Sequence, residues 1–175
     1  CHVLEGSTIT DQSGRTEAKI SNFGGFIGFG DSDAEPTKLT VKNCTAKIDV
    51  NSGDWAQVNS TFIGSLGYAP EVLLEDCSVE GNVIAGANPQ NYAGGLIARA
   101  QMSGIEGVET GRTVVVKNCT FKGSVKGRAG VSGLVGGIEG GEISISGSSA
   151  EGAITNTQNN CGGIIGLMQA TATIE

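Results

Sequence analysis

A short glycine-rich box occurs five times along the chain, and this repetition constrains the fold more than any other feature. The copies begin at Gly25, Thr61, Gly95, Gly133 and Gly163, so the intervals are 36, 34, 38 and 30 residues. Periods of this length are typical of repeat architectures, in which each unit packs only against its neighbours. The glycines of the boxes are Gly25, Gly28, Gly64, Gly95, Gly133, Gly136, Gly163 and Gly166.

A second segment follows each of the first four boxes and alternates apolar and polar residues. Its copies start at Leu39, Val72, Val114 and Ile143. Apolar residues two positions apart face the same side of a β-strand, so these segments are expected to be strands with one buried face. A third short segment completes each unit, at Val50, Val83, Val125 and Ile154.

Each unit therefore holds about three short strands that cannot bury an apolar face alone, and stacking the units in register solves this. The sequence predicts an all-β fold, a single-stranded right-handed parallel β-helix (β-solenoid) of about five coils with 30–38 residues each. The 29 glycines and the low aromatic content, 5%, agree with short strands and tight turns. We expect one domain over 1–175, a fragment of a longer repeat protein. Its units are 22–57, 58–92, 93–130, 131–160 and a partial 161–175, and the segments 29–37, 84–93 and 99–112 are expected to loop out as insertions.

Alignment of the units predicts columns of equivalent residues. A structural ladder of small inward residues is formed by Cys44, Cys77, Cys119 and Ser148. A bend is expected one residue earlier, where each residue type tolerates a left-handed backbone: Asn43, Asp76, Asn118 and Gly147. Two outward columns alternate in sign, as stacking about 4.8 Å apart favours: Lys42/Glu75/Lys117 and Lys47/Glu80/Lys122/Glu151.

The cysteines are interpreted as packing residues, because a buried free cysteine behaves as a small apolar side chain. A soft-metal site and a disulfide between Cys44 and Cys77 are the alternatives. Zinc is disfavoured, because its ligands normally come as closely spaced pairs of Cys or His. Cys1 is placed outside the repeat, and Cys161 is expected at a rim or core position.

Other motifs have a plain structural interpretation beside a functional one. Asp31, Asp33 and Glu35 are a weak calcium candidate, and a solvated insertion loop is the preferred interpretation. Asn43, Asn59 and Asn118 begin N-glycosylation sequons. Two of these arise at the bend of the repeat itself, so structural use is preferred. The single histidine, His2, is expected to be an ordinary surface residue.

Charge and motif content narrow the function classes. The net charge of −7 disfavours nucleic acid, and no apolar run is long enough for a membrane helix, so no membrane insertion is expected. No catalytic set and no cofactor are predicted, and we expect a protein that is not an enzyme. A polysaccharide lyase or hydrolase is the alternative, with Glu106 and Glu109 as the best local concentration of acids. Trp55, Tyr68 and Tyr92 are the aromatic residues that could bind a glycan.

The boxes, of the general form G-G-[FLI]-[IV]-G, and the following Asn-Cys-Thr segments resemble the GLUG repeat over residues 22 to 168. That resemblance implies an extracellular or cell-surface β-solenoid with a structural or adhesin-like task and carries no catalytic residues. Partners would be other surface proteins or glycans, and end-to-end self-association is possible. The alternatives are a carbohydrate-binding or carbohydrate-cleaving β-helix and a subunit of a self-stacking extracellular filament. The box starting at Thr61 lacks its first glycine, which predicts a locally altered turn.

Overall fold

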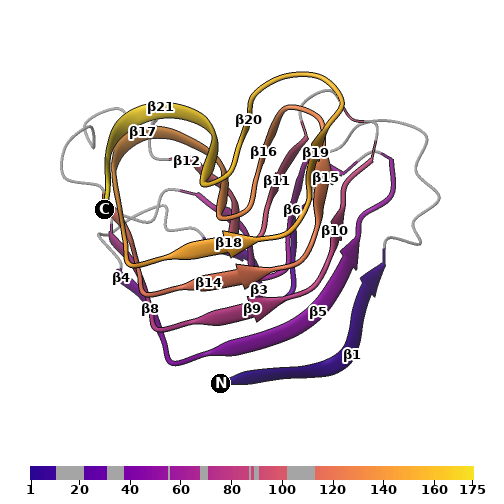
Figure 1. Cartoon of the computed structure of the whole chain (residues 1–175), viewed down its shortest axis with the longest axis horizontal. Helices are drawn as coiled ribbons and strands as arrows, with labels where there is room; N and C mark the ends of the chain where they lie inside the picture. The colour runs from indigo at the N-terminus through magenta and orange to yellow at the C-terminus, as the bar shows by residue number, and fades with distance from the viewer. Residues whose placement is uncertain are drawn as a thin grey trace.

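The structure is a computed structural model that describes residues 1–10, 22–30, 38–54, 56–67, 71–86, 88, 91–101 and 113–175. The predicted all-β class is confirmed: the described residues form strands and turns without a helix, and the strands pair in parallel (Figure 1). The described part of the chain contains no helix of the length and apolarity needed to cross a membrane.

The strands form three parallel sheets, here named A, B and C. Sheet A contains β1 (His2–Thr10), β5 (Thr45–Asn51), β9 (Ser78–Glu80), β10 (Val83–Ile84), β14 (Thr120–Lys122), β15 (Val125–Gly127), β18 (Ser149–Glu151) and β19 (Ile154–Asn156). Sheet B contains β2 (Asn22–Gly24), β6 (Val58–Ser60), β11 (Tyr92–Gly94), β16 (Gly130–Ser132) and β20 (Cys161–Gly162). Sheet C contains β3 (Ile27–Gly30), β4 (Lys38–Lys42), β7 (Ile63–Leu66), β8 (Glu71–Glu75), β12 (Ile97–Gln101), β13 (Thr113–Lys117), β17 (Val135–Ser146) and β21 (Ile165–Ile174).

Equivalent residues of successive repeats pair with one another across these sheets. In sheet C the third residue of each box pairs with its equivalent in the next box, in the series Ile27, Ile63, Ile97, Val135 and Ile165. Figure 1 shows the same order in sheet A, where β1, β5, β9, β14 and β18 lie side by side from the N-terminal to the C-terminal colours. The repeats of the sequence therefore correspond to the paired strands of the structure: each residue pairs with its equivalent in the next repeat.

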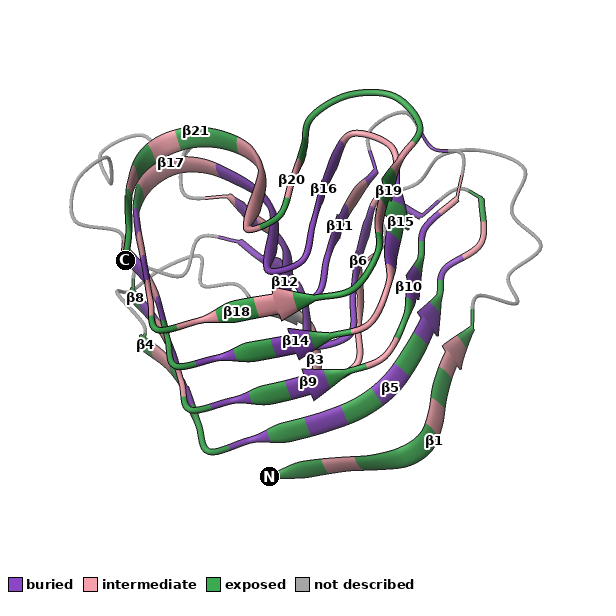
Figure 2. Ribbon diagram, in the orientation of Figure 1, coloured by how far each residue is buried: buried purple, intermediate pink, exposed green. Residues whose placement is uncertain are grey.

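Apolar columns fill the space between the sheets. Val41, Leu74, Val116 and Ile145, which come from the second segment of each unit, are at most 6% exposed. Alternation places these side chains on one face of their strands and the charged side chains on the other, as in the burial pattern of β5. Figure 2 shows that burial is greatest in the middle strands and lowest in β1, β18 and β21, because the outer strands have a neighbour on one side only.

The predicted insertions are shorter than expected. Strand pairing includes Ile27–Gly30, Val83–Ile84, Tyr92–Gly94 and Ile97–Gln101, so the ends of all three segments belong to strands, and the predicted limits 29–37, 84–93 and 99–112 were wrong. The physical reason is that these backbone groups hydrogen-bond to the adjacent repeat even where the side-chain pattern is interrupted. Residues 31–37, 87, 89–90 and 102–112 of these segments lie outside the described residues.

Candidate functional site

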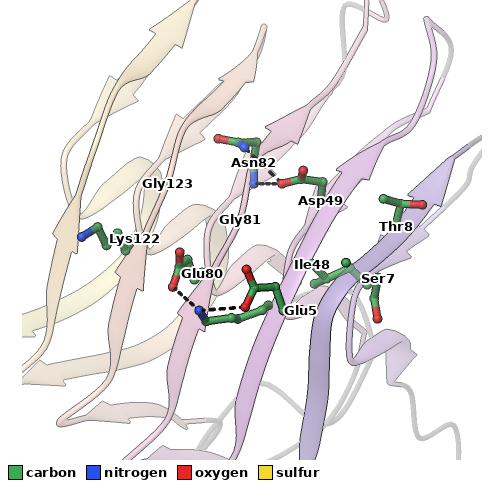
Figure 3. A pocket seen from close by; sticks show the side chains of 12 residues that line it. Glu5, Ser7, Thr8, Ile48, Asp49, Glu80, Gly81, Asn82, Lys122 and Gly123 are labelled. Carbon is green, nitrogen blue, oxygen red and sulfur yellow. Dashed lines mark hydrogen bonds and ion pairs between the residues drawn. The ribbon is translucent and has the colours of Figure 1, made fainter.

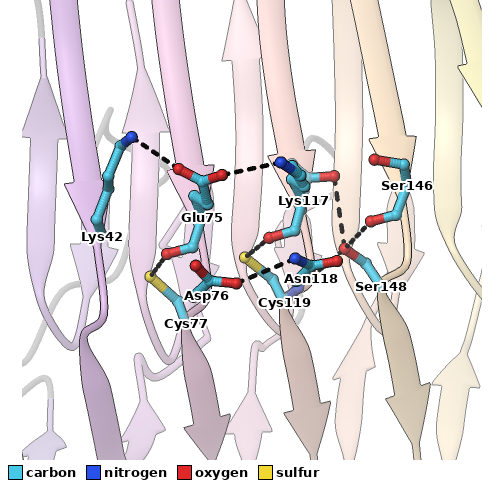
Figure 4. A network of polar contacts seen from close by, with 10 residues as sticks. Lys42, Glu75, Asp76, Cys77, Lys117, Asn118, Cys119, Ser146 and Ser148 are labelled. Atoms are coloured by element: carbon cyan, nitrogen blue, oxygen red, sulfur yellow. Dashed lines mark hydrogen bonds and ion pairs between the residues drawn. The ribbon is translucent and has the colours of Figure 1, made fainter.

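The bend residues turn the chain from sheet C into sheet A. Asn43, Asp76, Asn118 and Gly147 have φ values of 52°, 54°, 52° and 54°. This left-handed conformation costs about 1–2 kcal/mol for most residues, and Asn and Asp reduce that cost through local hydrogen bonds. The amide nitrogen of Asn118 donates to the carboxylate of Asp76 at 3.1 Å, so the bends also bind one another (Figure 4).

Charged side chains form ladders beside the bend. The carboxylate of Glu75 lies 2.7 Å from the ammonium group of Lys42 and 3.1 Å from that of Lys117 (Figure 4). Hydrogen bonds from Lys42 and then Lys117 hold the pKa of Glu75 below its usual value. The alternating signs in this column thus become ion pairs between neighbouring strands.

The predicted ladder of small residues lies inside the bend. Cys44, Cys77 and Cys119 are 5%, 2% and 0% exposed, and all three are free thiols. Burial raises the pKa of Cys77, and it raises that of Cys119 to about 11. Burial therefore disfavours the thiolate form of Cys77 and Cys119, which is the form that acts as a nucleophile. Ser148, the fourth member, donates its hydroxyl to the carbonyl of Ser146 at 3.0 Å.

Cys1 belongs to this column, so its placement outside the repeat was wrong. The amide of Thr45 donates to the carbonyl of Cys1 at 2.9 Å, just as the amide of Ser78 donates to the carbonyl of Cys44 at 3.0 Å. Sequence alignment missed this position because His2 follows Cys1, whereas Thr or Ser follows Cys44, Cys77 and Cys119. Cys161 lies elsewhere, exposed in β20 and paired with Val131.

A shallow polar groove of about 410 Å³ lies on the outer side of sheet A (Figure 3). Within it, the carboxylate of Asp49 accepts hydrogen bonds from the backbone amide of Asn82 at 2.7 Å and from its side-chain amide at 3.1 Å. The side-chain carbonyl of Asn82 in turn accepts from the hydroxyl of Ser124 at 2.6 Å. Lys47 lies 3.3 Å from Glu80 and 3.7 Å from Glu5, with its pKa raised chiefly by the hydrogen bond to Glu80. These polar groups pair neighbouring strands with one another. The sequence predicted the column of Lys47, Glu80 and Lys122 but not the groove that these residues line.

A second cluster joins sheets B and C. The hydroxyl of Tyr92 donates to Glu139 at 2.7 Å, the guanidinium of Arg99 donates to the same carboxylate at 2.8 Å, and Arg99 lies 5.2 Å from the centre of the Tyr92 ring. Burial, followed by the hydrogen bond to Glu139, raises the pKa of Tyr92 to about 12. Burial opposes ionisation of Glu139, but the hydrogen bonds from Arg99 and Tyr92 outweigh it and lower its pKa.

A proton donor or acceptor in general acid–base catalysis should titrate near the working pH. The raised pKa of Tyr92 and the lowered pKa of Glu139 therefore disfavour such a role near pH 7. The cluster instead joins three strands, β11, β12 and β17. The sequence singled out Tyr92 as an aromatic residue and Arg99 as the start of an insertion, but nothing in it linked either one to Glu139, which lies in another repeat.

The glycine boxes form the sharp bends between sheets B and C, at β2–β3, β6–β7, β11–β12, β16–β17 and β20–β21. A Cβ atom at Gly136 would lie 2.5 Å from the carbonyl oxygen of Ala98 and 2.8 Å from that of Ala93. Backbone therefore approaches backbone where only glycine leaves room. Thr61 occupies the same bend without a change of register, and its buried hydroxyl donates to the carbonyl of Gly95 at 2.6 Å. The predicted alteration of that turn was wrong.

Other candidate residues are scattered. His2 is exposed and its ring nitrogen lies 2.6 Å from the hydroxyl of Thr45. Of the sequon asparagines, Asn43 and Asn118 are exposed, whereas Asn59 is 0% exposed and neither polar atom of its side chain has a hydrogen-bond partner. The calcium candidates Asp31, Asp33 and Glu35, the aromatic residues Trp55 and Tyr68, and the acids Glu106 and Glu109 lie outside the described residues.

Among the described residues, no three His, Cys, Asp or Glu side chains gather closely enough to chelate a metal ion. No family model, no curated protein and no solved structure matches this chain.

Proposed function

We propose that the chain is a structural, adhesin-like β-solenoid module that extends or presents binding regions at a cell surface. In this proposal the three sheets are the sides of a right-handed parallel β-helix of about five coils, and the module acts outside the cell. The GLUG-like boxes suggest that setting. The observation that carries the proposal is the in-register pairing of equivalent residues through all three sheets.

The use of the polar side chains supports a mechanical task. Glu75, Asn82 and Asn118 each bind side chains or backbone of the neighbouring repeats. Ladders of this kind resist the sliding and separation of stacked strands. A spacer needs that property, whereas a catalyst needs unpaired groups directed at a substrate.

Spin-label distances test the architecture. In a variant with Cys1 and Cys161 replaced by serine, labels are placed at Leu4 in β1 and Glu151 in β18, both exposed. Four strand spacings of about 4.8 Å separate these strands, so a distance distribution centred near 19 Å is expected. A broad distribution extending beyond about 38 Å, twice that length, would exclude a single stack.

Binding and cleavage assays test the task. The isolated chain is screened against arrays of immobilised glycans and against acidic and neutral polysaccharides, with release of reducing or unsaturated ends as the readout. A structural module gives neither binding nor cleavage. Reproducible glycan binding or depolymerisation that is lost in E139Q or D49N would replace this proposal with the carbohydrate alternative.

A self-stacking filament subunit is the second candidate, and the end layers favour it. At the C-terminal end Ile154, Ile164 and Ile165 are partly exposed, whereas Val125 and Val135, the equivalents of two of them one layer earlier, are 0% exposed. A second copy stacked there would cover them. Sedimentation velocity across a range of concentrations and negative-stain images would reveal such rods.

The charged column of sheet A, Lys47/Glu80/Lys122/Glu151, provides a control for the filament hypothesis. Lys47 pairs with Glu5 at one end of the ladder, and Glu151 lies at the other end, so stacked copies would bring two carboxylates together. E151K should then strengthen association at low salt, and a filament subunit whose association is unchanged by E151K would not stack in this register.

A further inference from the structure

The two ends of the stacked strands carry the outer edges of all three sheets. At one end these edges are β1 in sheet A, β2 in sheet B, and β3 with β4 in sheet C; we name them the first layer. At the other end they are β18 with β19, β20, and β21; we name them the last layer. On the outer side of each layer no described strand pairs with the backbone N–H and C=O groups. Open edges of this kind pair readily with another chain.

Apolar side chains in these layers are less covered than their equivalents inside the stack (Figure 2). Met168 and Ile174 of the last layer are 53% and 55% exposed, whereas Ile138 and Ile145, their partners on β17, are 0% and 1% exposed. The partly buried apolar residues that pack against the core lie in or next to the first and last layers. Both ends therefore combine open backbone edges with uncovered apolar surface.

The first and last layers are the two ends of the same columns. In sheet A, successive pairs lead from Ile9 through three buried valines to Ile154. Because equivalent residues pair throughout the sheets, a strand layer placed beyond the last layer continues these columns if it presents the residues of the first layer. The column ends in sheets A, B and C include Ile9 and Ile154, Phe23 and Cys161, and Leu39 and Ala172.

The direction of the strands determines how a second copy fits. The strands of both layers pair in parallel with their neighbours, and both layers run from sheet A through sheet B to sheet C along the chain. A copy shifted along the axis of the stack therefore offers its first layer to its neighbour's last layer with all three sheets parallel. Contact between two last layers would require one copy to be inverted, which reverses its strands and separates each column from its equivalent.

A charged column also favours the shifted arrangement. Glu175 follows the pair of Ile174 and Ile145, so it lies at the end of the outward column that begins at Lys42. A shifted copy would bring its own Lys42 about 4.8 Å along the stack from Glu175, and the alternation of charge would continue across the junction. This attraction opposes the repulsion between carboxylates at Glu151 in sheet A.

We propose that the last layer of this chain binds the first layer of a second copy, in the one register that continues every column. The proposal rests on the β-helix architecture proposed above, and it assigns to the filament candidate the residues that meet at the junction: Ile154 with Ile9, Cys161 with Phe23, and Ala172 with Leu39. The interface is heterologous, because two different surfaces meet. Such an interface does not close on itself when copies are related by a shift, so the product is an open rod.

Disulfide trapping tests the register. The variant C1S/F23C carries one introduced thiol in the first layer and the exposed thiol of Cys161 in the last layer. Within one copy these positions are four strand spacings apart, about 19 Å, which is too far for a disulfide. At the proposed junction their Cα atoms are about 4.8 Å apart, within the range of a disulfide. Oxidised glutathione added to a concentrated solution should therefore give a ladder of covalent multimers on a non-reducing gel.

A second variant tests the same register in sheet A. I9C/I154C, in a chain that also carries C1S and C161S, places its two thiols at the ends of one apolar column. It should give the same ladder of multimers. Circular dichroism checks that each variant folds, and the second pair keeps the test decisive if replacement of Phe23 prevents folding.

Matched controls separate the junction from random collision. C1S/L4C puts a thiol at a first-layer position that is 75% exposed but belongs to another column than Cys161. Thiols held together at a junction react as if at millimolar concentration, so C1S/F23C should cross-link about tenfold faster than C1S/L4C. E175K, added to C1S/F23C, should slow cross-linking at low salt and have less effect in 1 M NaCl, because salt screens exposed charges.

The proposal is overturned if C1S/F23C and I9C/I154C fold but cross-link no faster than C1S/L4C. It is also overturned if C1S alone dimerises through Cys161 as fast as C1S/F23C forms multimers, since two last layers would then be in contact. The spin-label distance between Leu4 and Glu151 distinguishes these failures from failure of the architecture. A distance near 19 Å without register-specific cross-links rejects the junction and leaves the β-helix standing.

Discussion

The hydroxyl of Tyr92, in β11, donates a 2.7 Å hydrogen bond to the carboxylate of Glu139, in β17, and so joins sheet B to sheet C across the glycine-box bend. The ring of Tyr92 lies against Gly130 and Gly137, where a Cβ atom would be 2.9 Å and 2.5 Å from ring carbons. These glycines, which lie opposite Tyr92 and Arg99 on the neighbouring strands, thus make space for the tyrosine ring.

This contact should be visible in the pH dependence of stability. The pKa of Tyr92 is raised from about 10 to about 12, so the folded chain holds a proton that the unfolded chain loses. Its stabilising contribution is complete below pH 10 and is lost as the pH rises toward 12. Denaturation with urea at pH 9 and pH 11.5 should show a larger loss for the wild-type chain than for Y92F. Equal losses in the two proteins would contradict the assignment.

Inverting the Lys42–Glu75–Lys117 ladder tests whether its alternating signs matter. E75K places three like charges in one column and should lower the midpoint of thermal unfolding, whereas the triple variant K42E/E75K/K117E restores alternation and should recover it. The difference between E75K and wild type should shrink in 1 M NaCl, because salt screens exposed charges. If the triple variant is no more stable than E75K, the ladder contributes nothing by its charge order.

Two glycine-to-alanine changes in the boxes form a matched pair. G136A introduces a methyl group 2.5 Å from the carbonyl oxygen of Ala98, whereas a Cβ at Gly163 meets nothing within 4 Å. Overpacking at Gly136 should reduce the free energy of unfolding by about 1–3 kcal/mol. G163A should leave it within about 0.5 kcal/mol or raise it slightly. Urea denaturation measures both changes. A similar loss of unfolding free energy at both positions would mean that glycine is required for backbone flexibility rather than for lack of space.

The bend residue Asn118 should tolerate glycine better than alanine. Its φ of 52° costs a residue with a Cβ atom about 1–2 kcal/mol unless the side chain compensates. N118A also removes the hydrogen bond to Asp76, so its thermal midpoint should fall well below that of N118G. Gly147 already fills the equivalent bend. A more stable N118A than N118G would show that the left-handed conformation carries no strain here.

Asn59 is a buried amide whose polar atoms have no hydrogen-bond partner, and it is in register with Phe23 and Ala93. Leucine is similar in size and apolar, so N59L should raise the free energy of unfolding by about 1–3 kcal/mol, the usual cost of a buried unpaired polar group. N59D, which buries a charge, is the opposite control and should be strongly destabilising. Destabilisation by N59L would show that the amide has a partner of its own in solution.

Much of the strand arrangement could be predicted from local patterns, and the site could not. The shared column of Val41 and Leu74 can be predicted because each repeat has the same alternation of apolar and polar residues. That alternation determines which side of a strand is buried. No repeated sequence pattern identifies Glu139 as part of a site. Its partners Tyr92 and Arg99 lie in other repeats, and their distance to Glu139 depends on how closely the glycine boxes let two sheets approach.

The sequence by itself determined the all-β class, the order of the columns and the residues of the bend, because these follow from residue types repeated at a fixed period. Only the tertiary structure decided that Cys1 extends the cysteine column and that Asn59 is buried. It also brought the side chains of Tyr92, Arg99 and Glu139 onto one another. The physical reason is that these relationships depend on which residue lies opposite on the next strand, a property of the packed layers rather than of any single repeat.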